Sequence, residues 1–388
     1  MSQEPAKYDA RDIQVLEGWE AIRKRPGMYI GSTKERGLHQ LVFEVAGLVV
    51  NEVLAGRATR ADFTLLPGGG VRVADDGPGL PFEGAGCAGS PGLEARLTQM
   101  NVHKGPGGSR YPVLDLCGVG PFVANALSSW MVAEVQREGI RRVQQYARGV
   151  AVAAPADAGP AAGSGTAISF WPDSDIFETT ECSFDVLAQR FRELAFLNRN
   201  LDISLTDERR PSEPRSVRFR SPGGVREMVA YLDEQAAALV HPDPDIMCFE
   251  RDDARIAGSM EVALRWRDSG RDLVRSYANS RPTPDGGPHV AGFHDAVEAA
   301  VSAYAREQGL LAAQSPDLAT DRLSEGLTAV VSVKLEHPDF QGPIRGRLGN
   351  AEVRACVREA VQEHLGRWLE EHPKQAAAII GRICAEAA

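Results

Sequence analysis

The chain has 388 residues, of which 43% are hydrophobic and 25% are charged, a composition typical of a soluble globular protein with two or three domains. Its formal net charge of −10 argues against a broad nucleic-acid-binding surface. We find neither an apolar run of transmembrane length nor a signal-peptide pattern at residues 1–5, so no membrane contact is expected. Six cysteines without CxxC spacing indicate a reduced, cytoplasmic protein that does not bind zinc.

The first long apolar segment runs from Gly37 to Gly56 and predicts a buried helix. It carries Glu44, Leu48 and Asn51 at i, i+4 and i+7, so these three side chains share one face. A buried carboxylate is costly unless it is paired or used, which makes Glu44 a candidate general base. The alternative is a partly exposed amphipathic helix with its acids in water, and the helix alone does not decide between the two.

Two predicted strands follow, at residues 61–67 and 71–76, with a glycine turn between them. Asp75 and Asp76 end the second strand and precede Gly77-Pro78-Gly79. A carboxylate at a strand end beside glycines can meet the polar edge of a ligand at close range. The same residues also make an ordinary turn.

Residues 83–110 are rich in glycine and predict a loop, either a mobile lid or a poorly ordered segment. Gly118-Val119-Gly120 then precedes a second apolar helix at residues 122–127. A glycine turn at a helix N-terminus can hold an anion, although a lone GxG motif is weak evidence.

The remaining elements follow from periodicity and turn residues. Strands are predicted at residues 131–153, 165–171, 260–267 and 327–335, a loop at 154–163, and helices at 184–196, 225–239, 290–307 and 351–371. Ser221-Pro222-Gly223-Gly224 is the best candidate boundary between two domains, because the pattern restarts after it.

Short motifs along the chain form a combination that is more specific than any one of them. They are Tyr8-Asp9-Ala10, Val15-Leu16-Glu17-Gly18, Arg23-Lys24-Arg25-Pro26-Gly27-Met28-Tyr29-Ile30-Gly31, Leu41-Val42-Phe43-Glu44-Val45, Asp75-Asp76-Gly77, Gly165-Thr166, Phe170-Trp171-Pro172-Asp173, Ala195-Phe196-Leu197-Asn198, Asp285-Gly286-Gly287 and Ala291-Gly292-Phe293. Together they resemble the ATPase region of the DNA gyrase B and topoisomerase IV family, from residue 8 to about residue 384. The resemblance implies an α+β fold: a GHKL (Bergerat) ATP-binding sandwich with an N-terminal dimerisation arm at 1–222, and an α/β transducer domain at 223–388.

The resemblance also implies roles for matching residues. Glu44 matches the base that activates the attacking water, and Asp75 matches the aspartate that hydrogen-bonds the adenine amino group. The other matching positions are Gly79 and Thr166 in the adenine pocket, Gly118, Val119 and Gly120 in the phosphate loop, Arg137 at an aminocoumarin contact, Arg345 at the lysine that contacts the γ-phosphate, and Tyr8 and Ile13 in the arm that swaps across an ATP-bound dimer.

The departures from the family pattern lie on the phosphate side. Leu48 stands where the family places an asparagine that holds Mg²⁺, and a leucine has no oxygen for a hard cation. Pro78 replaces an arginine of the adenine-side loop. In the phosphate loop, Asp115 replaces a glycine and adds negative charge beside the expected triphosphate, and Cys117 replaces a histidine.

Three functions are therefore open. The first is a non-hydrolysing gyrase-B-like protein that binds ATP, an adenine-like ligand or an aminocoumarin, as a homodimer or with a gyrase subunit, and acts as a modulating or resistance factor. The second is an enzyme of specialised metabolism that uses Glu44 as acid or base. The third is a weak ATPase with Mg²⁺ held only by water and phosphate. We find nothing resembling the TOPRIM or DNA-cleaving domains, so a complete topoisomerase and direct nucleic-acid binding are not expected.

Overall fold

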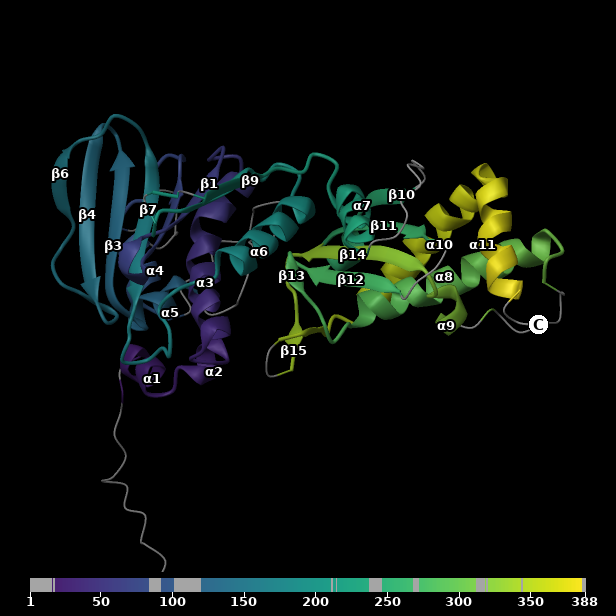
Figure 1. The fold of residues 1–388 in the computed structure, drawn as a ribbon, viewed down its shortest axis with the longest axis horizontal. Helices are drawn as coiled ribbons and strands as arrows, with labels where there is room; N and C mark the ends of the chain where they lie inside the picture. The colour runs from purple at the N-terminus through teal and green to yellow at the C-terminus, as the bar shows by residue number, and fades with distance from the viewer. Residues whose placement is uncertain are drawn as a thin grey trace, which may run out of the picture.

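The computed structural model describes residues 16, 18–83, 92–100, 120–210, 212–213, 215–236, 246–267, 272–311, 318, 320–342 and 345–385. Figure 1 shows two lobes along the longest axis, each with a sheet and helices. Helices and strands both contribute to each lobe, so the expected α+β class is confirmed.

The first lobe is built on a nine-stranded sheet in the order β5-β4-β3-β7-β2-β1-β8-β9, with β6 also paired to β4. Its strands are β1 (Ala61–Leu65), β2 (Val71–Asp75), β3 (Ser128–Arg137), β4 (Ile140–Ala147), β5 (Val150–Ala151), β6 (Ala156–Pro160), β7 (Gly165–Pro172), β8 (Ile203–Asp207) and β9 (Arg215–Phe219). Neighbouring strands are antiparallel except β1 and β8, which are parallel. Burial alternates along β1 and β2, which is the pattern of a sheet with one face on the core.

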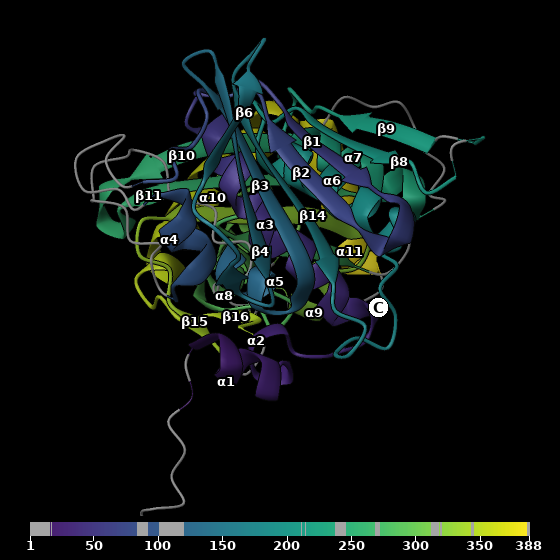
Figure 2. The same cartoon turned by 90° about the vertical axis from the view of Figure 1, so that its left-hand side faces the viewer.

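Helices of the first lobe are α1 (Gly18–Lys24), α2 (Gly27–Ile30), α3 (Glu35–Leu54), α4 (Leu93–Thr98), α5 (Pro121–Ala126) and α6 (Phe184–Leu197). In Figure 2 the strands β1 to β4 lie in front of α3. Leu41 of α3, Phe63 of β1, Phe170 of β7 and Phe191 of α6 are buried in one continuous core. The sheet and α3 therefore hold any residue on their shared face in a fixed position.

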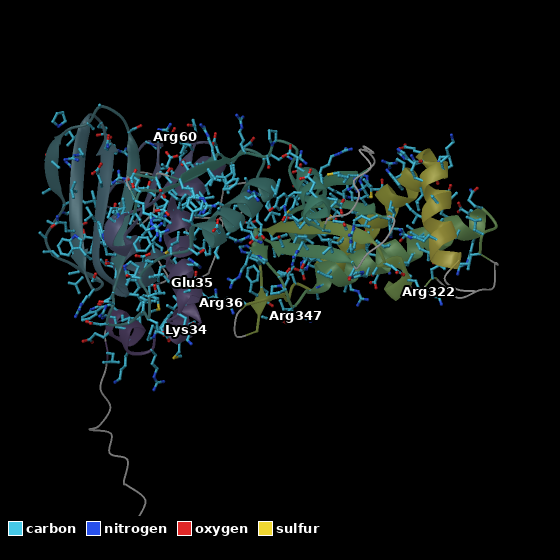
Figure 3. All side chains as sticks on the ribbon, viewed as in Figure 1. Lys34, Glu35, Arg36, Arg60, Arg322 and Arg347 are labelled. Atoms are coloured by element: carbon cyan, nitrogen blue, oxygen red, sulfur yellow. The ribbon has the colours of Figure 1, made fainter. Side chains whose placement is uncertain are left out.

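Helix α3 is apolar because it lies inside the lobe. Among the described helices, α3 alone has the length and hydropathy of a membrane span. The expectation of no such apolar run was therefore wrong by those two criteria. However, 72% of the most apolar window of α3 is buried within the protein. Its first turn is polar, and Figure 3 shows Lys34, Glu35 and Arg36 at the edge of the lobe. Glu44 and Glu52 are buried, so the alternative of an amphipathic helix with its acids in water is wrong.

The second lobe contains a five-stranded sheet in the order β10-β11-β14-β12-β13 and a separate hairpin of β15 and β16. Its strands are β10 (Met247–Asp253), β11 (Gly258–Trp266), β12 (Leu273–Ala278), β13 (Arg281–Pro282), β14 (Leu327–Leu335), β15 (Phe340–Gln341) and β16 (Arg347–Leu348), and its helices are α7 (Val225–Gln235), α8 (Pro288–Glu307), α9 (Thr320–Leu323), α10 (Val353–Glu371) and α11 (Pro373–Ala385). Helices α8 and α10 pack closely because Gly292 has no Cβ, which would lie 2.3 Å from the Arg354 carbonyl oxygen. The predicted boundary at 222/223 falls between the end of β9 and the start of α7 and stays a prediction.

The two lobes meet through a small apolar cluster and several hydrogen bonds. Phe196 and Leu197 of α6 pack with Val225 and Val229 of α7. The Asn198 Nδ2 donates to Ser280 Oγ at 3.0 Å, and both side chains are buried. This junction fixes the end of α6 against the second sheet.

Some local predictions were wrong. Residues 154–163 contain the strand β6, whose five residues are all exposed and which is held by pairing with β4 rather than by a buried face. The predicted loop at 83–110 contains the helix α4, which buries only Leu93 and Leu97 and so has too short an apolar pattern to recognise. The strands β8, β9, β10 and β12 and the helix α11 were not predicted.

Candidate functional site

Glu44 points from the middle of α3 toward the start of α5. Its Oε2 accepts a hydrogen bond from the Gly120 backbone N–H at 2.5 Å, and its Oε1 accepts one from Gln40 Nε2 at 3.3 Å. The side chain is only 4% exposed. Gly120 has φ of 93°, a conformation that glycine adopts without strain, and this turn directs its N–H at the carboxylate. Glu44 is thus a buried acceptor anchored to the segment that leads into α5.

Leu48 lies one helical turn after Glu44 and is buried in the core of the first lobe. Mg²⁺ requires oxygen ligands in near-octahedral geometry, and Leu48 supplies none. Among the residues that the structure describes, no group of three or more His, Cys, Asp and Glu side chains is placed to hold a metal ion. This face of α3 therefore does not fit the magnesium site that the family pattern implies, and we assign no metal-dependent step to it.

Asp75 is the last residue of β2, and its carboxylate is only partly satisfied. Its Oδ1 accepts from the Gly77 N–H at 2.8 Å, whereas Oδ2 is buried and accepts no well-formed hydrogen bond from the described residues. Burial raises the pKa of Asp75 to about 6 against the lowering effects of the Gly77 and Thr166 N–H groups, and the nearby Glu52 charge raises it further. A buried oxygen without a well-formed hydrogen bond can accept one from a donor on a ligand.

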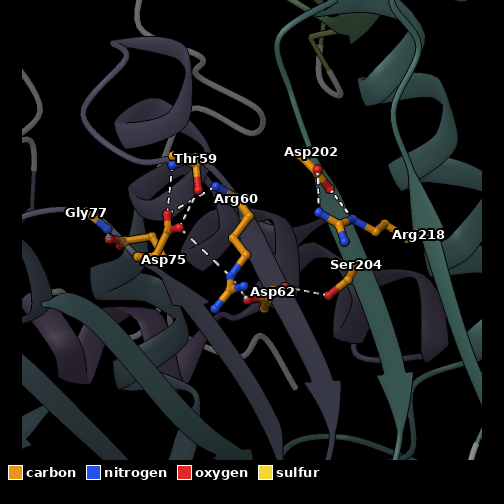
Figure 4. Close-up of polar contacts among 9 residues, drawn as sticks. Thr59, Arg60, Asp62, Asp75, Gly77, Asp202, Ser204 and Arg218 are labelled. Carbon is orange, nitrogen blue, oxygen red and sulfur yellow. Dashed lines mark hydrogen bonds and ion pairs between the residues drawn. The ribbon is translucent and has the colours of Figure 1, made fainter. Parts of the chain in front are cut away.

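The adjacent Asp76 differs from Asp75, which Figure 4 shows beside Gly77, because its pKa is shifted in the opposite direction. Its carboxylate accepts from the Thr59 N–H at 2.7 Å, from the Thr59 hydroxyl and from the Arg60 N–H at 3.1 Å. Burial is the largest single influence on the pKa of Asp76 and raises it, but these hydrogen bonds together outweigh burial and hold the pKa below its usual value. Asp76 therefore stabilises a surface turn, while Asp75 faces inward.

Thr166 and Gly79 are brought to Asp75 by the strand order β3-β7-β2. Thr166 Oγ1 is buried and accepts from the Leu80 N–H at 2.9 Å, which ties the turn after β2 to β7. A Cβ on Gly165 would lie 2.2 Å from the Asp75 carbonyl oxygen, and one on Gly79 would lie 2.6 Å from the Gln136 carbonyl oxygen. Both glycines allow close approach of backbone segments, and the three predicted adenine-pocket residues Asp75, Gly79 and Thr166 do lie together.

Arg137 ends β3 and contacts this same turn. Its Nη1 donates to the Gly79 carbonyl oxygen at 3.2 Å, and its Nε lies 2.9 Å from Glu138 Oε1. The side chain is partly exposed, so it lies at the rim of the Asp75 region rather than inside it. The role of Arg137 at a pocket mouth stays a prediction.

Glu52 lies close enough to Asp75 for its charge to act on that carboxylate, and no motif in the sequence indicates a role for it. Glu52 is 6% exposed and binds Arg57 through two hydrogen bonds, of 2.8 Å to Oε2 and 2.7 Å to Oε1. Arg57, just after the end of α3, neutralises Glu52, and Arg96 of α4 is also close enough to interact with this carboxylate. The sequence signal for this ion pair is an acid within an apolar helix, because a buried carboxylate needs a partner of opposite charge nearby.

Other predicted site residues lie elsewhere. Arg345 is in the loop between β15 and β16 of the second lobe, with φ of 52°. The dimer-arm residues Tyr8 and Ile13 and the phosphate-loop residues Asp115, Cys117, Gly118 and Val119 lie outside the described residues. Of the predicted phosphate loop, only Gly120 is described, and it binds Glu44.

Comparisons with known proteins agree on one family. A sequence model of DNA gyrase B matches residues 224–388. The chain is 44% identical to the DNA gyrase B protein of Streptomyces coelicolor, over 97% of this chain and 57% of that protein. It is 42% identical to a novobiocin-resistant DNA gyrase B protein of Streptomyces niveus, with the same coverage. The chain thus spans 57% of the length of these curated relatives.

Solved structures support the same fold over nearly the whole chain. The 43K ATPase domain of Thermus thermophilus gyrase B, in complex with an aminocoumarin, matches with a TM-score of 0.76 and 33% identity, covering 96% of this chain and 95% of that one. The ATP-binding domain of Francisella tularensis topoisomerase IV, in complex with a small-molecule inhibitor, matches with a TM-score of 0.75 and 27% identity, covering 96% and 97%. The expected GHKL fold followed by a transducer-like part is therefore confirmed.

Proposed function

The chain belongs to the DNA gyrase B family, and from that membership we propose that it binds ATP or an adenine-like ligand without hydrolysing it at a useful rate. One observation carries the proposal: the buried Asp75 Oδ2 lacks a well-formed hydrogen bond while the rest of that carboxylate is held in place. An exocyclic amino group of a planar heterocycle would donate to this oxygen. The neighbouring Thr166 and Gly79 complete a rigid and largely buried wall.

The absence of hydrolysis is proposed from the face of α3. Glu44 remains at the position of the water-activating base, but its carboxylate is bound to the Gly120 N–H. Leu48 offers no oxygen to a cation that would bridge the phosphates. Without that charge neutralisation, the triphosphate of a bound ATP is held less tightly and is not activated, so the base has no reaction to assist.

The proposed biological role is that of a cytoplasmic gyrase-B-like pseudoenzyme that modulates gyrase or confers resistance by binding its ligands. One relative is a novobiocin-resistant gyrase B, and one solved relative binds an aminocoumarin. Arg137 at the rim of the Asp75 region supports an aminocoumarin as a ligand for this chain too. We propose that the chain forms a homodimer, or a heterodimer with a gyrase subunit, through the arm that contains Tyr8 and Ile13.

Titration calorimetry with ATP, adenosine and an aminocoumarin tests ligand binding. We expect adenosine or the aminocoumarin to bind the wild type and Asp75→Asn to weaken that binding tenfold or more, because the substitution replaces one acceptor oxygen with a donor. The matched control is Asp76→Asn, which removes the same charge from the adjacent residue on the outer face. Failure of all three compounds to bind, or equal effects of the two variants, would refute the proposal.

A phosphate-release assay with Mg²⁺ tests the loss of hydrolysis. We expect no release above background from the wild type and no change in Glu44→Ala. Leu48→Asn restores an oxygen ligand, so magnesium should strengthen ATP binding by this variant and not by the wild type, provided that thermal melting shows it folded. Release by the wild type that Glu44→Ala abolishes would instead identify a weak ATPase.

A further inference from the structure

A groove of about 470 Å³ lies at the junction of the two lobes, away from the Asp75 region. Its lining residues come from the end of β9, the last turns of α6 and the helix α7. Figure 1 shows these elements at the junction of the two lobes. Its volume falls within the range of roughly 300–1,000 Å³ that small-molecule sites occupy, and junctions between domains are common places for such sites. Its lining comes from both sides of the linker between the lobes.

The lining combines arginine side chains with aromatic rings. Arg192 donates to the Tyr231 hydroxyl at 2.6 Å, and its guanidinium lies 4.9 Å from the Tyr231 ring centroid and 5.1 Å from that of Phe219. Phe196 and Tyr231 rings lie 5.6 Å apart. The groove thus has planar, polarisable walls with a cation already oriented between two of the rings.

The charge of this lining is unbalanced. Arg218 is neutralised by Asp202, which it contacts through two hydrogen bonds of 2.7 and 2.6 Å. Arg192 and Arg220 have no carboxylate partner among the described residues, and none of the described lining residues is acidic. Two unpaired guanidinium groups in one groove are unexpected in a chain with 53 acidic and 43 basic residues.

We infer that this groove binds a small aromatic phosphate monoester, a planar ring that carries a dianion. The Arg192 guanidinium lies over the faces of Phe219 and Tyr231, so the ligand ring would contact the edges of these two rings. The phosphate would accept hydrogen bonds from Arg192 and Arg220, whose planar donors suit phosphate geometry. Because β9 and α7 belong to different lobes, a bound ligand contacts both and holds the linker in one arrangement. The site shares no residue with the Asp75 region and does not depend on the function proposed for it.

Calorimetry of the full chain with 1-naphthyl phosphate tests this inference. We expect saturable binding of this probe and much weaker binding of 1-naphthol, which lacks the anion, and of inorganic phosphate, which lacks the ring. Arg220→Gln should weaken binding about tenfold, because it removes a charge-assisted hydrogen bond. Arg210→Gln is the matched control, since Arg210 is also an exposed arginine, lies at the other end of the same hairpin and does not line the groove.

Phe219→Leu provides an independent test, because it keeps an apolar side chain and removes an aromatic contact, so it should weaken naphthyl phosphate more than inorganic phosphate. Three outcomes would overturn the inference: no saturable binding, equal losses in Arg220→Gln and Arg210→Gln, or tight binding of inorganic phosphate alone. Binding that Asp75→Asn abolishes while Arg220→Gln leaves it intact would place the probe in the nucleotide pocket and would also overturn it.

Discussion

The raised pKa of Asp75 makes a specific prediction about stability and pH. Burial raises this pKa from 3.8 to about 6, so the folded protein holds a proton that the unfolded chain releases in this range. The contribution of the protonated carboxyl to the free energy of unfolding is fully present below pH 4. This contribution is lost as the pH rises toward 6. At 1.36 kcal/mol for each unit of pKa, the loss is about 3 kcal/mol, and it persists at pH 7.

Asp75→Asn removes this titration while keeping the shape of the side chain. The free energy of unfolding of the variant, relative to the wild type, should therefore rise by up to about 3 kcal/mol between pH 4 and pH 7. Urea denaturation at several pH values measures this difference directly, because titrations common to both proteins cancel. The midpoint of the change should lie between pH 4 and 6.

Asp76→Asn is the control, since hydrogen bonds hold the pKa of Asp76 below its usual value. The stabilisation from Asp76 is present above the unfolded pKa and lost as pH falls, so the difference between wild type and this variant should change with pH in the opposite sense. Parallel pH profiles for the wild type and Asp75→Asn would refute the claim that Asp75 carries an unsatisfied buried charge.

Three substitutions test the rest of the architecture by urea denaturation. Asp233→Ala should lower the free energy of unfolding by about 3–5 kcal/mol, because the fully buried carboxylate pairs with Arg265 of β11 and with Arg267, just after that strand. A loss below about 1 kcal/mol would contradict this. Gly165→Ala should cost about 1–3 kcal/mol and weaken adenosine binding, since its Cβ would meet the Asp75 carbonyl oxygen at 2.2 Å. Asn198→Ala should cost about 1–3 kcal/mol by leaving Ser280 without its inter-lobe hydrogen bond, and an unchanged midpoint would show that the lobes do not depend on it.

Strong periodicity allowed the long elements to be predicted closely. The predicted strand at 327–335 coincides with β14, and the predicted helix from residue 37 to 56 overlaps α3 except at its ends. Both are defined by burial, which imposes a repeat of two or 3.6 residues on the apolar side chains. The strand β6 could not be found this way, because its exposed residues carry no such repeat and only backbone pairing with β4 defines it.

The site depended on contacts that spacing does not reveal. Asp75 and Thr166 meet because β2 pairs with β7, and Glu44 meets Gly120 because α3 lies beside α5. Only the family resemblance suggested that these residues belong together. The Glu52–Arg57 pair was missed because no motif indicates which arginine a buried acid pairs with.

Leu48, on the expected phosphate side of the ligand site, and Asp75, on its adenine side, have different effects on the stability of the fold. Leu48 joins the core of the first lobe, where burying a leucine contributes about 2 kcal/mol, whereas a metal-binding asparagine at that position would add none of it. Asp75 has the opposite effect, because its ionised carboxylate destabilises the empty protein above pH 6. A ligand that donates to Asp75 Oδ2 offsets this penalty, and it does so most when the carboxylate is charged. Such a ligand should therefore raise the free energy of unfolding more at pH 7 than at pH 5, and this difference should vanish in Asp75→Asn.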